Sequence, residues 1–176
     1  MMIKKFSEFI TEGMWGSALR RSNTAKERKD DEANRIQEFI NKQRKPESIY
    51  ITDGNVINSK SYIIIRDTDL INGKLPFKFG RVDGDFDCYK CTSLTSLEGA
   101  PQEVGGNFSC SDCPSLKSLK GAPQEVGENF SCSNCTSLTS LEGAPQKVGG
   151  DFYCNYCTSL TSLEGVPKKI GGKFIN

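Results

Sequence analysis

The second half of this 176-residue chain repeats one unit of 22 residues. Each unit carries a phenylalanine, two cysteines, two leucines and a proline at fixed positions. A unit this short cannot bury its own apolar face, so successive units must stack on one another. The sequence therefore predicts a mainly β fold with a helical N-terminus, in which the repeats form a short solenoid of parallel strands. The repeated residues are Phe86, Phe108, Phe130, Phe152 and Phe174; Cys88, Cys110, Cys132 and Cys154; Cys91, Cys113, Cys135 and Cys157; Leu94, Leu116, Leu138 and Leu160; Leu97, Leu119, Leu141 and Leu163; and Pro101, Pro123, Pro145 and Pro167.

Alternation inside one unit predicts a short strand followed by a bend. Phe108 and Cys110 are two residues apart and share one face of a strand, with Ser109 and Ser111 on the other face. Cys113 and two leucines then follow at intervals of three, which suits a bend and an extended return. We therefore expect the phenylalanines, cysteines and leucines to point inward and to stack on their equivalents in neighbouring units.

Changes of pattern along the chain predict three segments. Residues 1–48 should form an amphipathic helix over 2–12 and a charged helix over 24–44, whose thin apolar stripe should dock on a neighbour. Residues 49–82 alternate in a β pattern and should form an N-terminal cap, with Ile64 standing 22 residues before Phe86 in a degenerate unit. Residues 83–176 are the solenoid itself. The stripe consists of Ala33, Ile36, Phe39 and Ile40.

Composition argues against several classes of function. Lysine and arginine number 23 against 22 acidic residues, so the near-neutral chain gives no support for a nucleic-acid partner. No window reaches the roughly 18 consecutive apolar residues of a membrane span. The absence of histidine excludes imidazole bases and mixed Cys/His metal sites. We expect no enzyme activity, no nucleic-acid partner and no membrane partner.

The eight cysteines allow three interpretations. Cys88-x-x-Cys91 followed by Cys110-x-x-Cys113 has the spacing of a zinc ribbon, so zinc or an iron–sulfur cluster is one alternative, and disulfides are another. The repeat period by itself imposes this spacing, however, and stacking would place the sulfur atoms in two parallel columns. Free cysteine is also among the most buried residue types. We favour structural thiols, with no metal and no cofactor, and keep a cysteine-rich metal-binding protein as an alternative function.

The repeat resembles the leucine-rich repeat family, whose signature is L-x-x-L-x-L-x-x-N/C-x-L. Phe108 and Cys110 match the two inward strand positions, and Cys113 matches the Asn/Cys position. The resemblance covers residues 82–176 and is similar to the cysteine-containing, BspA-like variant, although Phe and Cys replace the strand leucines and Leu116 lies one residue beyond the signature. It implies a leucine-rich-repeat solenoid that acts as a non-catalytic protein–protein interaction module.

The outward strand positions are the candidate partner-binding face. Hydroxyl and amide side chains in the middle units are flanked by tyrosines, a residue type that often anchors protein partners. We expect a protein partner, from the host or from a virion, to bind there. The expected contact residues are Asp85, Asp87, Tyr89 and Lys90 in the first full unit; Ser109, Ser111 and Asp112 in the second; Ser131, Ser133 and Asn134 in the third; and Tyr153, Asn155 and Tyr156 in the fourth.

The first residues resemble the capsid-targeting leader of internal head proteins in T-even-type tailed phages. Residues 6–10 match the body of that leader, and Ile10-Thr11-Glu12 matches its cleavage triplet, so Gly13 would become the first residue. The resemblance implies a phage-encoded protein located in the virion or in the host cytoplasm. The alternative function is therefore a structural or internally packaged virion protein.

The last strand edge is expected to need a cover. Residues 172–176 stop in the middle of a fifth unit, and native proteins usually protect unpaired strand edges. We expect the N-terminal helices, a second copy of the chain or another protein to cover this edge. A homo-oligomer through the C-terminal edge is one of these outcomes.

Overall fold

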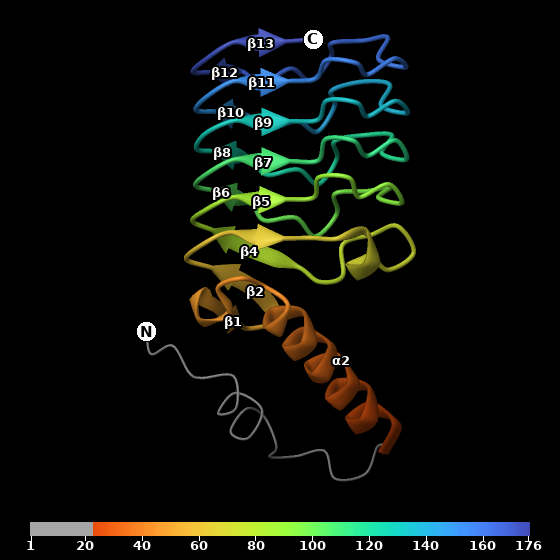
Figure 1. The fold of residues 1–176 in the computed structure, drawn as a ribbon, viewed down its shortest axis with the longest axis vertical. Helices are drawn as coiled ribbons and strands as arrows, with labels where there is room; N and C mark the ends of the chain where they lie inside the picture. Colours follow the sequence, from red (N-terminus) through yellow and green to blue (C-terminus); the bar gives the residue numbers. More distant parts are fainter. Residues whose placement is uncertain (1–22) are drawn as a thin grey trace.

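The computed structural model describes residues 23–176, which form one N-terminal helix followed by a parallel β-solenoid (Figure 1). The solenoid is mainly β, has about five turns and advances by about 22 residues per turn, which confirms the predicted fold class. The predicted helix over 2–12 and the leader residues Ile10, Glu12 and Gly13 lie outside the described residues. No helix within residues 23–176 has the length and apolar character needed to cross a membrane.

Two sheets run the length of the solenoid. The first, sheet A, contains in spatial order β1 (Ile49–Thr52), β2 (Val56–Ser59), β4 (Phe79–Val82), β6 (Glu103–Val104), β8 (Glu125–Val126), β10 (Lys147–Val148) and β12 (Lys169–Ile170). The second, sheet B, contains β3 (Ile63–Ile64), β5 (Phe86–Asp87), β7 (Phe108–Ser109), β9 (Phe130–Ser131), β11 (Phe152–Tyr153) and β13 (Phe174–Ile175). All neighbours are parallel except β1 and β2, which form an antiparallel hairpin. Short 3-10 helices occupy Pro46–Ser48 and Asp67–Asp69.

Each regular turn therefore contains two strands, where the sequence predicted one. The predicted strand around Phe108 is β7, and the additional strand is Glu103–Val104, which pairs in register with the same residue types one turn away. Val104 is 2% exposed, so it points inward as predicted. The second sheet closes the core on the side opposite sheet B.

Equivalent residues stack into continuous columns inside the solenoid. The five phenylalanine rings from Phe86 to Phe174 lie with centroids 5.0 to 5.6 Å apart and ring planes within 19° of parallel. The first four of these rings are fully buried, as are both cysteines and both leucines of the middle turns. Burial of one such side chain contributes roughly 1.5–3 kcal/mol, so the repeated columns are the main source of cohesion between turns.

A left-handed backbone position reverses the chain after sheet B. Lys90, Asp112, Asn134 and Tyr156 have φ between 56° and 61°, a region that non-glycine residues seldom occupy. Each stands directly before the second cysteine of its turn. The unusual backbone turns that cysteine back into the core and leaves the side chain before it on the surface.

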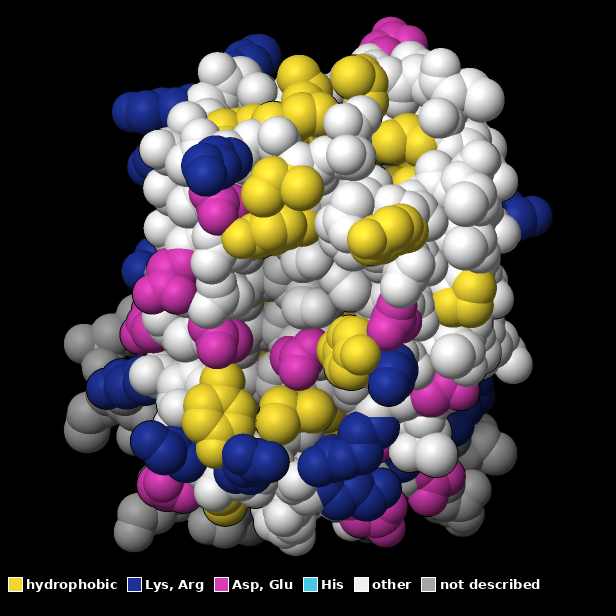
Figure 2. Space-filling model, turned by 45° about the horizontal axis from the view of Figure 1, so that its top comes forward, with side chains coloured by type: hydrophobic (Ala, Val, Ile, Leu, Met, Phe, Trp, Pro, Cys, Tyr) yellow, Lys and Arg dark blue, Asp and Glu magenta, His cyan; other side chains and the backbone are white. Residues whose placement is uncertain are grey.

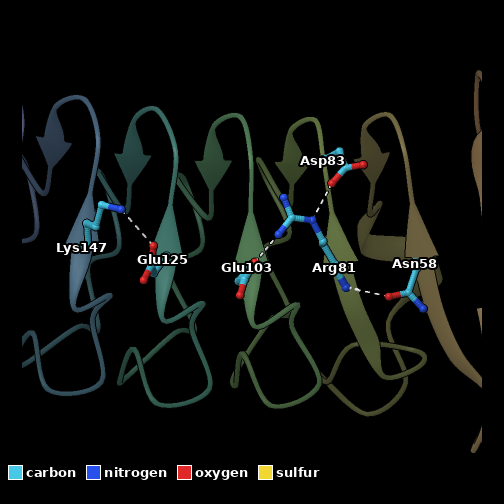
Figure 3. Close-up of polar contacts among 6 residues, drawn as sticks. All are labelled: Asn58, Arg81, Asp83, Glu103, Glu125 and Lys147. Atoms are coloured by element: carbon cyan, nitrogen blue, oxygen red, sulfur yellow. Dashed lines mark hydrogen bonds and ion pairs between the residues drawn. The ribbon is translucent and has the colours of Figure 1, made fainter.

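The first turn of the solenoid is out of step with the others by one residue. Ile57 pairs with Phe79, but Ser59 pairs with Val82, so the ladder contains a bulge. The Asn58 side chain fills it by accepting a hydrogen bond from the Arg81 backbone amide at 2.8 Å (Figure 3). The expected alignment of Ile64 with Phe86 is consequently wrong, and Ile63 takes that place in sheet B.

The helix α2 (Asn23–Asn41) closes the N-terminal end of the solenoid (Figure 1). Ile36, Phe39 and Ile40 of the predicted stripe are buried, and the Phe39 ring meets Phe77 and Phe79 edge-on at 5.5 and 5.8 Å. The helix ends three residues before the predicted position 44. Because α2 lies at the N-terminal end, the expectation that this helix covers the C-terminal edge is wrong.

A glutamine just after α2 completes the closure of sheet B. The Gln43 side-chain amide donates to the Ile64 carbonyl at 3.0 Å, and its oxygen accepts from the Ile64 amide at 2.9 Å. This side chain therefore replaces a missing neighbouring strand at the edge of β3. The hairpin formed by β1 and β2 does the same for sheet A.

The C-terminal end has no such closure within the described residues. β12 and β13 each have a neighbour on one side only. Phe174 and Ile170 are half-buried, and Leu163 and Val166 are 47% and 42% exposed. Their equivalents one turn earlier, Phe152, Val148, Leu141 and Ala144, are all buried.

Candidate binding surface

The candidate surface is the outer side of sheet B together with the left-handed turn that follows it, here called the sheet B face. Every residue predicted to contact a partner lies on it, because alternate residues of each strand point into the core and out of it. Four columns run along it, each with one residue per turn. They are Asp85, Asn107, Asn129 and Asp151; Asp87, Ser109, Ser131 and Tyr153; Tyr89, Ser111, Ser133 and Asn155; and Lys90, Asp112, Asn134 and Tyr156.

Side-chain hydrogen bonds between turns fix the first column. The Asp85 Oδ1 atom accepts from the backbone amide of Asn107 at 2.7 Å and from its side-chain amide at 3.1 Å. Asn107 accepts from both amides of Asn129 in the same way, at 3.1 and 3.0 Å. The Asn129 oxygen then accepts from the Asp151 backbone amide at 2.7 Å. This ladder was not foreseen, and it links one border of the face from turn to turn.

Hydroxyl groups connect the next columns across the turns. The Ser111 and Ser131 hydroxyls lie 2.6 Å apart, and the Ser133 hydroxyl donates to the Asn155 side-chain oxygen at 2.6 Å. Ser111 is 9% exposed and so lies in the floor of the face. The Ser111, Ser131 and Ser133 hydroxyls in the middle of the face thus already have hydrogen-bond partners.

Exposed tyrosines stand at the two ends of the face. Tyr89 is 49% exposed in the first full turn, and Tyr156 is 71% exposed in the fourth. The Lys90 Nζ atom lies 5.1 Å from the centroid of the Tyr89 ring, a cation–π contact. With one turn per strand spacing of about 4.8 Å, the two rings are separated by roughly 14 Å along the solenoid axis.

The face is acidic. Its columns contain Asp85, Asp87, Asp112 and Asp151 against one cation, Lys90. Figure 2 views the sheet B side with the C-terminal end tilted forward. It shows acidic and hydrophobic side chains spread among uncharged polar ones, with Lys and Arg gathered in the lower part of the view. Hydrogen bonds from the Lys173 backbone amide and the Tyr153 hydroxyl lower the pKa of Asp151, so this carboxyl is ionised at neutral pH.

The outer side of sheet A differs because its charged side chains pair with one another, along a turn and between turns (Figure 3). Arg81 forms ion pairs with Asp83 and Glu103, and the Lys147 Nζ atom lies 3.1 Å from a Glu125 carboxylate oxygen. These side chains are about half exposed, and exposed pairs of this kind contribute only about 0–1 kcal/mol each. Sheet A therefore offers less uncompensated charge to a partner than the sheet B face.

The cysteines form hydrogen bonds that explain their place in the repeat. All eight are free thiols. The thiol of each second cysteine donates to a main-chain carbonyl of the preceding turn; Cys113 donates to Cys88 at 3.3 Å, and Cys135 donates to Cys110 at 3.1 Å. Burial raises the pKa of the Cys88 thiol, which opposes thiolate formation. Within residues 23–176, no three Cys, Asp or Glu side chains converge as a metal site would require.

Comparison with protein-family models, curated proteins and solved structures finds no match to this chain. The parallel solenoid and its spacing follow from the structure alone. Any function must therefore be argued from the surface chemistry described above.

Proposed function

We propose that this protein is a non-catalytic interaction module that binds another protein through the sheet B face. The observation that carries the proposal is the pair of exposed tyrosines, Tyr89 and Tyr156, at the two ends of a polar strip. Tyrosine supplies large contact area at low cost in side-chain entropy, and it is enriched among residues that dominate binding energy. The resemblance to leucine-rich repeats supports the same role, because members of that family act in recognition.

The charge of the face favours a partner with a basic, extended segment. Within residues 23–176, neither Asp87 nor Asp112 forms an ion pair. Arginine can bind such a carboxylate through two parallel hydrogen bonds. An arginine can also stack on an exposed tyrosine ring. A segment that carries arginines and lies along the solenoid axis would meet both groups.

Substitution of the two exposed tyrosines tests the proposal. The variant Tyr89→Ser/Tyr156→Ser should retain the fold, because both side chains lie on the surface, and should capture its partner from lysate at least about tenfold less well. The matched control is Gln102→Ser/Gln146→Ser, which changes two exposed residues next to sheet A. An arginine-rich peptide should compete with the partner, whereas a glutamate-rich peptide should not. Equal capture by the tyrosine variant and the control would rule out this face.

The alternative role is a structural or internally packaged virion protein. In this role, the edges of β12 and β13, which have a neighbour on one side only among residues 23–176, would dock into a neighbouring subunit. The resemblance of residues 6–13 to a phage leader supports a phage origin and a location in the virion or the host cytoplasm. Mass spectrometry of purified particles tests this role, which predicts a stoichiometric protein whose first residue is Gly13. Recovery only from the host cytoplasm, with residues 1–12 intact, would contradict it.

A further inference from the structure

Basic side chains gather beside the first strand of sheet B. The two hydrogen bonds between the Gln43 side chain and the main chain of Ile64 hold the segment after α2 along the edge of β3. The Arg66 guanidinium donates to the Lys42 carbonyl at 3.4 Å, so this arginine lies next to the same segment. All four of the gathered cations are exposed. They are here called the β3 patch and are Lys42, Arg44, Lys45 and Arg66.

Most of the charge of the β3 patch is not compensated. Within residues 23–176, Lys42, Arg44 and Lys45 form no ion pair. Arg66 forms one, in which Nη1 lies 3.9 Å from a carboxylate oxygen of Asp69, and that carboxyl is itself buried. Figure 2 shows Lys and Arg side chains gathered in the lower part of the view, toward the N-terminal end of the solenoid. An anionic group of a partner would therefore find several cations free to bind it.

The β3 patch adjoins the sheet B face directly. Ile64 of β3 pairs with Asp87 of β5, and the Ile65 amide donates to the Asp87 carbonyl at 2.8 Å. Because alternate residues of a strand share one face, this register places Arg66 one turn before Tyr89 in the same outward column. The patch thus continues the sheet B face into the turn that precedes its first full turn.

Charge therefore changes sign along the solenoid axis. The cations of the β3 patch stand before the first full turn, and the carboxylates of the sheet B face stand in the turns that follow. Asp85 and Asp87 belong to the first full turn, Asp112 to the second and Asp151 to the fourth. With a strand spacing of about 4.8 Å, the patch and Asp112 are roughly 10 Å apart along the axis. A partner that matches the whole surface must carry both signs of charge in a fixed order.

We propose that the partner segment of the sheet B face carries acidic residues at one end, which bind the β3 patch, and basic residues at the other, which bind the carboxylates. This inference rests on the proposed function and adds the direction of the bound segment. An extended chain rises about 3.3 Å per residue, so about three residues separate an acidic side chain at Arg66 from an arginine at Asp112. Arg44 and Arg66 can each bind a carboxylate through two parallel hydrogen bonds.

The same charge pattern argues against a nucleic-acid strand as the occupant. Such a strand carries negative charge along its whole length. If it bound the β3 patch and continued along the solenoid, it would reach Asp85 and Asp87 one turn later and would be repelled there. A protein segment can change the sign of its charge within a few residues, so it can match both parts of the surface.

Three synthetic peptides of equal length, titrated with the full chain by fluorescence anisotropy, test the proposal. The first peptide joins four glutamates to four arginines through two glycines. The second has glutamines in place of the glutamates, and the third has glutamines in place of the arginines. The first should bind at least about fivefold more tightly than the second at low salt. High salt should remove this advantage, because it screens exposed charges.

A pair of variants assigns the advantage to the β3 patch. Arg44→Gln/Lys45→Gln should abolish it and leave the affinity for the second peptide unchanged. Both side chains are exposed, so this variant should fold, as circular dichroism would verify. Lys168→Gln/Lys169→Gln removes two adjacent exposed cations at the last strand of sheet A and should preserve the advantage.

The outcomes separate this inference from the proposed function. Equal affinity of the first two peptides, or an advantage that survives in the Arg44 variant, would overturn the inference and leave the proposed function standing. No binding by any of the three would contradict a basic partner segment and this inference together. Tighter binding of the third peptide, or of a single-stranded oligonucleotide, than of the first would make the patch a separate anion site and would also overturn the inference.

A paramagnetic label on the first peptide tests the direction of binding. At the glutamate end, the label should broaden the NMR signal of the Arg66 amide more than that of the Tyr156 amide. At the arginine end, the order should reverse. The opposite pattern, or equal broadening from both ends, would show that the β3 patch does not orient the bound segment.

Discussion

Each end of the solenoid consists of the edge strands of the two sheets, but among the described residues only the N-terminal edges are covered. At the N-terminal end, an aromatic side chain from α2 covers the phenylalanine column, and the Gln43 amide pairs with the edge of β3. At the C-terminal end, the same columns stop without a cover in the described residues. Phe152 is fully buried while Phe174 is half-exposed, and Leu141 is fully buried while Leu163 is 47% exposed.

This difference shows that a repeat residue is buried by its neighbours on both sides and not by its own turn. Phe152 and Phe174 have the same place in the unit, yet only the first has a ring above and below it. Stacking identical turns therefore buries the apolar residues in the interior of a solenoid but leaves those at its two ends exposed. A segment with a different sequence, such as residues 23–66, is needed to cover the terminal turn.

The largest expected effect is the loss of stability on removing an aromatic ring, which should differ between the two ends. Phe39→Ala removes a buried ring from the N-terminal closure and should lower the free energy of unfolding by about 3–5 kcal/mol. Phe174→Ala removes a half-exposed ring and should cost roughly half as much. Denaturant unfolding at low protein concentration, where self-association does not contribute, measures both values. Equal losses would mean that α2 does not close the solenoid as described.

The glutamine cap predicts a smaller loss at the same end. Gln43→Leu leaves the Ile64 amide and carbonyl without their partner and should lower the free energy of unfolding by about 1–3 kcal/mol. Hydrogen exchange at the Ile64 amide should become faster. Gln146→Leu, at an exposed position of a regular turn, serves as the control and should change neither quantity measurably. Unchanged exchange at Ile64 in the Gln43 variant would show that the cap is not formed.

The reactivity of the cysteine thiols should differ between the two ends of the solenoid, and this difference can be measured in the native protein without any substitution. Cys157 is 9% exposed, and the neighbouring Cys132 side chain lowers its pKa to about 7, whereas Cys91 in the first turn is completely buried. Iodoacetamide should therefore modify Cys157 first in the native protein, at a rate that rises with pH through about 7 and then levels off. Peptide mapping by mass spectrometry identifies the site. Modification of Cys91 at the same rate would contradict the described burial.

The smallest expected effect concerns acid stability, to which each end contributes one carboxyl. Hydrogen bonds from the Ser93 backbone amide and hydroxyl lower the pKa of Asp67, and the Lys173 amide lowers that of Asp151. A carboxyl whose pKa is lower in the folded state stabilises the protein above its ordinary pKa of 3.8, and this stability is lost as the pH falls through the folded value.

Asp151→Asn tests this acid effect with a residue that the repeat already uses in the same column, at Asn107 and Asn129. The variant should keep the hydrogen bond to Lys173 and lose less stability than the wild type between about pH 5 and pH 2. Thermal unfolding over that range measures the difference. An identical pH dependence in the two proteins would show that Asp151 does not contribute.

Sequence reasoning found the columns but missed the features that depend on packing between turns. The period identified Phe108, Cys110 and Leu116 as inward residues because side-chain type reports burial directly. The two-residue strand Glu103–Val104 was missed because Pro101 and Gly105 beside it are typical turn residues, and only lateral pairing makes it a strand. The function of Gln43 was missed because a polar residue after a charged helix normally faces solvent.

The candidate surface was predictable in position but not in internal structure. Alternation with the buried residues placed Ser109 and Tyr153 on the outside. The ladder from Asp85 to Asp151 joins residues 22 apart, and comparing equivalent positions of each repeat could have revealed it, because all four are Asp or Asn. The left-handed backbone at Lys90 and Tyr156 could be inferred only from the same comparison, because Asp112 and Asn134 in that column favour this conformation whereas Lys and Tyr do not.

The thiol-to-carbonyl bond between successive turns makes the interior of this protein modular. Cys113 and Cys135 bind the preceding turn in the same way, so an inserted copy of one complete unit would find every contact it needs. Each added copy would lengthen the molecule by about 4.8 Å and move the exposed rings of Tyr89 and Tyr156 apart by the same step. The number of units thus sets the distance between the two exposed tyrosines. Adding a unit leaves the structures at both ends of the solenoid unchanged.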